Sequence, residues 1–113
     1  MSIKTERIGS NLVREISYIL ATEIKDQDIK FVTITDCKVT NDLSFAKVYY
    51  TVLDQSRKKE TDAALKSASG YIRHLLHDRV DIRHIPELTF VYDESIEYGE
   101  KIENIIEEIH EEK

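Results

Sequence analysis

A chain of 113 residues, of which 41% are hydrophobic, has the size of one domain and can fill one core of two layers. No apolar run reaches membrane-spanning length, no hydrophobic targeting segment opens the chain, and one cysteine allows no intrachain disulfide, so we expect a cytoplasmic protein. The net charge of −6 does not exclude a nucleic-acid partner, because residues 57–85 alone carry +3 and screening limits charge effects to about 8–10 Å.

The first half of the chain predicts a helix followed by a hairpin. Apolar residues recur at helical spacing over about residues 5–24, which indicates an amphipathic helix. Residues 31–36 are rich in β-branched side chains and residues 45–53 alternate between apolar and polar, so both segments predict strands. Residues 40–42 between them have typical turn chemistry. We therefore expect a hairpin whose sheet is buried on one face.

The second half predicts two short helices, a third strand and a C-terminal helix. Thr61 is the expected N-cap of the first helix, and a kink at Ala68-Ser69-Gly70 is expected to separate it from the second, which ends near residue 80. Residues 88–92 predict a strand, and the isoleucines of residues 96–109 predict a helix with an acidic outer face. The expected fold is α+β, a three-stranded sheet packed with helices in the order α-β-β-α-kink-α-β plus a C-terminal helix.

Gly70 permits two interpretations. A glycine inside a helix costs about 1 kcal/mol relative to alanine, so it is expected where two backbones pack closely or where the chain bends. A bend would expose backbone N–H groups at the start of the second helix, where the positive end of the helix dipole favours phosphate. Arg73 would then add charge in the first turn after the bend. The pattern alone leaves both interpretations open.

Basic side chains are concentrated in the same part of the chain. Lysines and arginines on a helix most often form only a solvated face. However, an A-form RNA helix displays phosphates and 2′-hydroxyls, which suit cationic side chains on a bent helical surface. We predict an RNA-binding surface composed of Arg57, Lys58, Lys59, Lys66, Arg73, His77, Arg79 and Arg83.

The sequence gives no support for catalysis or metal binding. His74 and His77 are three residues apart, but no cysteine pair or further ligand cluster accompanies them, so we expect no metal site and no cofactor. The chain has three glycines and lacks a Gly-rich phosphate loop, a nucleophile elbow and a Cys–His arrangement. We expect a binding protein and not an enzyme.

Four segments carry a family resemblance: residues 32–36, 42–49, 68–73 and 85–96. With Arg7-Ile8 in the first helix, they make nearly the whole chain similar to the ribosome-binding factor A family of bacterial small-subunit assembly factors. The resemblance implies a type II KH-like fold in which the Ala-x-Gly kink replaces the usual Gly-x-x-Gly loop. The chain departs from the family pattern at Asp26-Gln27, where Asp-Pro is usual, and at His74 and His77, where basic residues are common.

The resemblance also implies a function. Members of this family are non-catalytic and bind the free small (30S) ribosomal subunit during its late maturation. They support processing of 16S rRNA, near its 5′-terminal helix, and matter most in the cold. Because the Gly-x-x-Gly loop is missing, the resemblance implies recognition of folded rRNA shape and not the usual clamp on four single-stranded nucleotides.

An alternative function is a protein-interaction module. Residues 86–113 carry a net charge of −8, so the acidic C-terminal helix could bind a ribosomal protein or an assembly GTPase. We expect an RNA-binding domain over residues 1–98, an acidic helical extension over residues 99–113, and a monomer.

Overall fold

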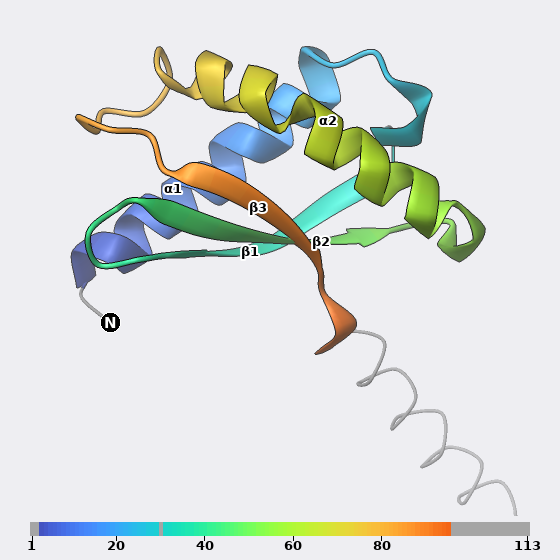
Figure 1. Ribbon diagram of the computed structural model, residues 1–113, viewed down its shortest axis with the longest axis horizontal. Helices are drawn as coiled ribbons and strands as arrows, with labels where there is room; N and C mark the ends of the chain where they lie inside the picture. The colour runs from blue at the N-terminus through green and yellow to red at the C-terminus, as the bar shows by residue number, and fades with distance from the viewer. Residues whose placement is uncertain (1–2, 30, 96–113) are drawn as a thin grey trace, which may run out of the picture.

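Helices α1 and α2 cover one face of a three-stranded sheet (Figure 1). The structure, a computed structural model, describes residues 3–29 and 31–95. The elements are α1 (Ile3–Thr22), η1 (Gln27–Ile29), β1 (Val32–Val39), β2 (Phe45–Val52), η2 (Gln55–Arg57), α2 (Lys58–Leu76) and β3 (Glu87–Tyr92). Within the described residues no helix covers the other face of the sheet. The predicted α+β class is confirmed, and so is the predicted order of helices and strands as far as β3, apart from the division of α2.

The sheet is mixed, with strands in the order β1-β2-β3. β1 and β2 form the predicted antiparallel hairpin, with Val39 opposite Ala46 near the turn and Val32 opposite Val52 at the far end. β3 lies parallel to β2, which requires a long crossover connection, and α2 lies in that connection. The crossover therefore brings the basic segment onto the same face of the sheet as α1.

The hydrophobic core lies between the helices and the sheet. Its largest fully buried side chain is Tyr50 of the central strand, whose ring packs edge-on against Tyr92 with centroids 5.6 Å apart. The Tyr50 hydroxyl donates to the Asp62 carboxylate at 2.8 Å, so the sheet and α2 are joined by a polar contact as well as by packing. The fully buried aliphatic side chains are Leu12, Ile16, Ile19, Ile29, Val48, Leu65, Ile72, Leu76 and Ile85.

The predicted pair of short helices is a single helix. α2 runs through Gly70 without interruption, so it has no second N-terminus and no exposed N–H groups at this point. Gly70 is exposed, and a Cβ atom added there would meet nothing within 4 Å. Ala68 packs partly against the core, and the Ser69 hydroxyl donates to the Lys66 carbonyl at 2.9 Å. Gly70 is therefore a solvent-facing glycine that the helix tolerates, and the predicted kink is wrong as a helix boundary.

The start of α2 also differs from the prediction. The helix begins at Lys58, and Arg57 at the N-cap position makes no side-chain cap hydrogen bond. Thr61, the predicted N-cap, is buried inside the first turns, and its hydroxyl donates to the Asp28 carbonyl at 2.8 Å. The hydroxyl thus joins α2 to η1, which sequence spacing alone does not indicate.

The glycine that permits two backbones to pack closely is Gly9 in α1, and not Gly70. α1 crosses β1 so closely that a Cβ atom at Gly9 would lie 2.5 Å from the Cys37 carbonyl oxygen. Gly9 is buried in a helix whose apolar stripe faces the sheet. The close-packing interpretation that the sequence allowed for Gly70 therefore applies to α1.

Cys37 should react with thiol reagents only when the protein opens. Its side chain is buried on β1, and burial, together with the Asp36 carboxylate, raises the pKa of the thiol to about 12. At pH 8 the thiolate population is then roughly a thousandfold smaller than for an exposed cysteine of ordinary pKa. We expect slow labelling of the native protein by Ellman's reagent and fast labelling in urea. Fast native labelling would instead show local opening of β1.

The predicted C-terminal helix and the predicted boundary at residue 98 lie outside the described residues. Within the described part of the chain, neither helix combines the length and the apolar character that crossing a membrane requires.

Candidate nucleic-acid interface

The eight residues of the predicted RNA-binding surface lie on or beside α2. Arg57 precedes the helix, Lys58, Lys59, Lys66 and Arg73 belong to it, and His77, Arg79 and Arg83 follow it. One element therefore collects most of them, as the sequence indicates. Their contacts differ, however, because several of the cations have partners within the protein.

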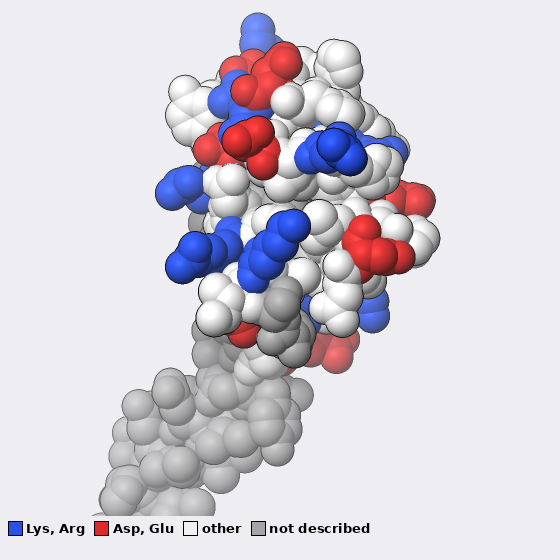
Figure 2. All heavy atoms as spheres, turned by 90° about the vertical axis from the view of Figure 1, so that its left-hand side faces the viewer, with Lys and Arg blue, Asp and Glu red and all other residues white. Residues whose placement is uncertain are grey.

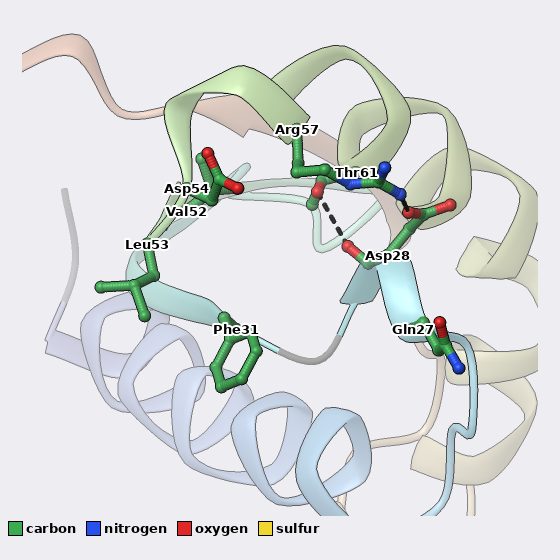
Figure 3. A pocket seen from close by; sticks show the side chains of 8 residues that line it. All are labelled: Gln27, Asp28, Phe31, Val52, Leu53, Asp54, Arg57 and Thr61. Carbon is green, nitrogen blue, oxygen red and sulfur yellow. Dashed lines mark hydrogen bonds and ion pairs between the residues drawn. The ribbon is translucent and has the colours of Figure 1, made fainter.

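Arg57 is anchored to the 3-10 turn η1. Its guanidinium forms an ion pair with the Asp28 carboxylate, which raises the pKa of Arg57 (Figure 3). In the same view the Thr61 hydroxyl meets the Asp28 carbonyl, so η1 is held to the start of α2 by two contacts. A cavity of about 280 Å³ lies beside them, lined in part by Phe31 and Leu53, both exposed. The charge of Arg57 is thus compensated before any ligand binds.

Lys58 and Lys59 stand at the N-terminal end of α2, beside the end of β3. The Lys58 ammonium lies 3.8 Å from the centroid of the Tyr92 ring, which is a cation–π contact. Lys59 is exposed and has no ion pair among the described residues. Both line a concave surface of about 450 Å³ together with Gln55, whose amide meets the Tyr92 hydroxyl at 2.6 Å. These two lysines are therefore placed to face a ligand.

Lys66 is exposed but already paired. Its ammonium lies 2.8 Å from the Asp62 carboxylate one helical turn earlier. The Lys66 ammonium and the Tyr50 hydroxyl both lower the pKa of Asp62, so this carboxylate is charged at neutral pH. A phosphate near Lys66 would have to compete with Asp62.

Arg73 has a structural role that the sequence does not reveal. Its Nε and one terminal nitrogen donate to the Ile85 carbonyl oxygen, at 3.1 and 2.8 Å, and its side chain is half-buried. The two bonds hold the segment before β3 against α2. Arg73 is therefore turned toward its own chain in this structure.

Arg79 connects the segment after α2 to the end of α1. Its guanidinium donates to the Glu23 carboxylate at 3.0 Å and lies over the Tyr18 ring at 5.2 Å. Like Arg73, it links segments that are distant in sequence.

His77 and Arg83 are exposed and make no ion pair among the described residues. Nowhere among the described residues do three or more His, Cys, Asp or Glu side chains come together in a group that could hold a metal ion. Figure 2 views one end of the domain, where basic and acidic side chains mix near the top and several basic side chains stand together lower down. The outward side chains of the predicted set are thus Lys58, Lys59, His77 and Arg83, with Lys58 half-buried beside Tyr92. We call Lys58, Lys59 and Arg83 the outward cations.

A second group of cations lies outside the predicted segment. Lys38 on β1 and Lys47 on β2 are exposed on the open face of the sheet, with Phe45 and Tyr49 on either side of Lys47. The alternation of residues 45–53 carries the signal for this group, because burying Ala46, Val48 and Tyr50 on one face leaves Phe45, Lys47 and Tyr49 on the other. Sequence reasoning used that alternation for the core and not for the opposite face.

Comparisons with known proteins point to one family. A family model described as ribosome-binding factor A matches residues 4–106. Ribosome-binding factor A of Staphylococcus epidermidis is 50% identical over 110 residues, covering 96% of this chain and 95% of that one. The Staphylococcus saprophyticus protein of the same name is 47% identical over 111 residues, covering 97% of each chain.

Solved structures of the same name share the fold. The crystal structure of ribosome-binding factor A from Thermus thermophilus matches with a TM-score of 0.68 at 24% identity, covering 78% of this chain and 94% of that one. A Thermus thermophilus homology model fitted into a cryo-EM map of a 30S complex matches with a TM-score of 0.62 at 20% identity, covering 84% and 97%. At these identities the likeness shows the fold alone.

Proposed function

Because this chain belongs to the ribosome-binding factor A family, we propose that it binds the free small ribosomal subunit during late maturation. The match over nearly the whole chain, at 50% identity to a relative of that name, is the observation that carries the proposal. The Thermus thermophilus protein fitted into the 30S complex adds support, since it shares the fold of this chain.

We further propose that the bound ligand is 16S rRNA and that binding supports its processing near the 5′-terminal helix, with the largest effect in the cold. On this proposal the protein is a cytoplasmic monomer without catalytic activity, and assembly GTPases are further candidate partners. What supports an RNA partner in this chain is the group of outward cations on and after α2, because phosphate contacts supply most of the affinity in RNA binding.

The contacts within the protein rank the predicted residues. Lys59 and Arg83 are exposed and unpaired within the described residues, so an rRNA phosphate can approach them without displacing a carboxylate. Lys66 must first release Asp62. If three or four cations contact phosphate, the logarithm of the binding constant should fall with the logarithm of salt concentration with a slope of about −2 to −4.

The first test is sedimentation of a cell extract through a sucrose gradient at low salt. We expect the protein with free small subunits and not with joined ribosomes. Neutralising two of the outward cations, with Lys59→Gln and Arg83→Gln together, should weaken binding to purified small subunits about tenfold. Lys66→Gln should weaken it less than Lys59→Gln alone, because Asp62 already compensates the Lys66 charge.

Two results would change the proposal. Wild-type protein that stays at the top of the gradient at low salt would contradict subunit binding itself. Unchanged binding of the double variant would leave the function standing but contradict the assignment of its surface. A chain that ends at residue 99 separates the alternative function, because a module acting through the acidic C-terminal segment would lose its partner.

A further inference from the structure

Two lysines face each other on the open side of the sheet. Lys38 and Lys47 are directly opposite in the β1–β2 register, and both are exposed. Like charges in directly opposed positions of an antiparallel pair destabilise the sheet. Neither ammonium has a carboxylate within 4.0 Å among the described residues, so no described side chain neutralises this pair of charges. An anion placed between them would.

Aromatic rings lie on both sides of this pair along β2. Phe45 and Tyr49 are two residues before and two residues after Lys47, on the same face, while Ala46 and Val48 are buried on the other face. Phe45 is 53% exposed, and the Lys38 ammonium lies 5.8 Å from the centroid of the Tyr49 ring. At a rise of about 3.3 Å per residue, the two aromatic positions are roughly 13 Å apart, with the ammonium pair between them.

Acidic groups limit the length of this basic strip. Glu87 is opposite Phe45, and Asp36 is opposite Tyr49, so a carboxylate stands near each end. The Asp36 carboxylate accepts the Cys37 N–H at 2.8 Å, which holds it on its own strand. Thr89 on β3 is opposite Lys47 and adds a small polar side chain. The strip therefore suits a ligand only a few nucleotides long.

We propose that the open face of the sheet binds a short single-stranded RNA segment, with bases stacked on Phe45 and Tyr49 and a phosphate between Lys38 and Lys47. This inference rests on the proposed function in that the partner is RNA, but it concerns a face that α2 does not reach. Aromatic side chains combined with a cationic strip are the arrangement that binds single strands without sequence preference.

The test measures anisotropy of a labelled ten-nucleotide oligouridylate at low salt, with no ribosome present. Tyr49→Leu should weaken binding at least about fivefold, the lower end of base–aromatic stacking. Lys47→Glu should also weaken it and make the salt slope shallower by about 0.7 for each phosphate that the variant no longer neutralises. Because Lys47→Glu places opposite charges face to face, its Tm should equal or exceed that of the wild type. Weaker binding at undiminished stability is the expected signature.

Lys25→Glu is the matched control, since it makes the same charge change at an exposed lysine beyond the end of α1 that belongs to neither proposed surface. The inference is overturned if the wild type fails to bind the oligonucleotide at low salt, or if Lys25→Glu weakens binding as much as Lys47→Glu. Co-sedimentation of the same variants with small subunits separates the two proposals. Wild-type co-sedimentation with unchanged oligonucleotide binding by Lys47→Glu and Tyr49→Leu would refute this inference and leave the proposed function intact.

Discussion

Gly9→Ala should destabilise the protein, and Gly70→Ala should stabilise it. A Cβ atom at Gly9 would lie 2.5 Å from the Cys37 carbonyl oxygen, a backbone atom that can move only if α1 and β1 separate. Overpacking of this kind costs typically about 1–3 kcal/mol. For a domain of this size each kcal/mol lowers the Tm by about 4–8 °C. We therefore expect Gly9→Ala to lower the Tm by several degrees or more.

The opposite sign at Gly70 follows from its surroundings. A Cβ atom there meets nothing within 4 Å, and the backbone is already helical. Alanine at a compatible position stabilises by about 0.4–1 kcal/mol because the unfolded chain loses freedom. Urea denaturation of both variants is the measurement, with Ser10→Ala on the exposed side of α1 as a control that should change little. Destabilisation by Gly70→Ala would show that α2 bends at this residue and would restore the kink.

The two glycines explain which part of the fold could be predicted from the sequence. Apolar spacing identifies α1, the alternation in β2 identifies the strand, and turn residues identify the hairpin, because each of these signals is local. What a glycine does inside a helix depends on the atom opposite its Cα, which belongs to another element. For Gly9 that atom is in β1, 28 residues away, and for Gly70 there is none. No local pattern separates these cases.

The same distinction applies to the candidate site. The sequence shows that basic residues are concentrated in and around α2, but it cannot show that Arg57 meets Asp28 or that Arg79 meets Glu23. These partners precede the cations by 29 and 56 residues, and the fold brings them together. A count of cations therefore overstates the free positive charge of α2. It also passes over Lys38 and Lys47, whose pairing appears only in the strand register.

Arg73 is the residue for which structural and binding roles can be confused most easily. Its guanidinium donates twice to the carbonyl of Ile85, a residue that is only 1% exposed. Hydrogen bonds to charged groups contribute about 1.5–3 kcal/mol, and a buried carbonyl left without a donor adds to the cost. Arg73→Met should therefore lower the free energy of unfolding by about 2–3 kcal/mol, measured by urea denaturation. Arg73→Lys should recover only part of this stability, because an ammonium cannot reproduce the planar two-donor fork.

The pair of variants also decides whether Arg73 binds RNA. If its charge contacts phosphate, Arg73→Lys should keep small-subunit binding while Arg73→Met loses it, at a temperature where both are folded. If Arg73 only holds the segment before β3, both variants should be less stable yet bind subunits as the wild type does. Charge reversal at Arg73 would not separate loss of phosphate binding from loss of stability, because a carboxylate facing the Ile85 carbonyl oxygen would repel it. Subunit binding must therefore be compared at equal folded fraction, and weaker binding common to both variants under that condition would mean that the guanidinium geometry itself is recognised.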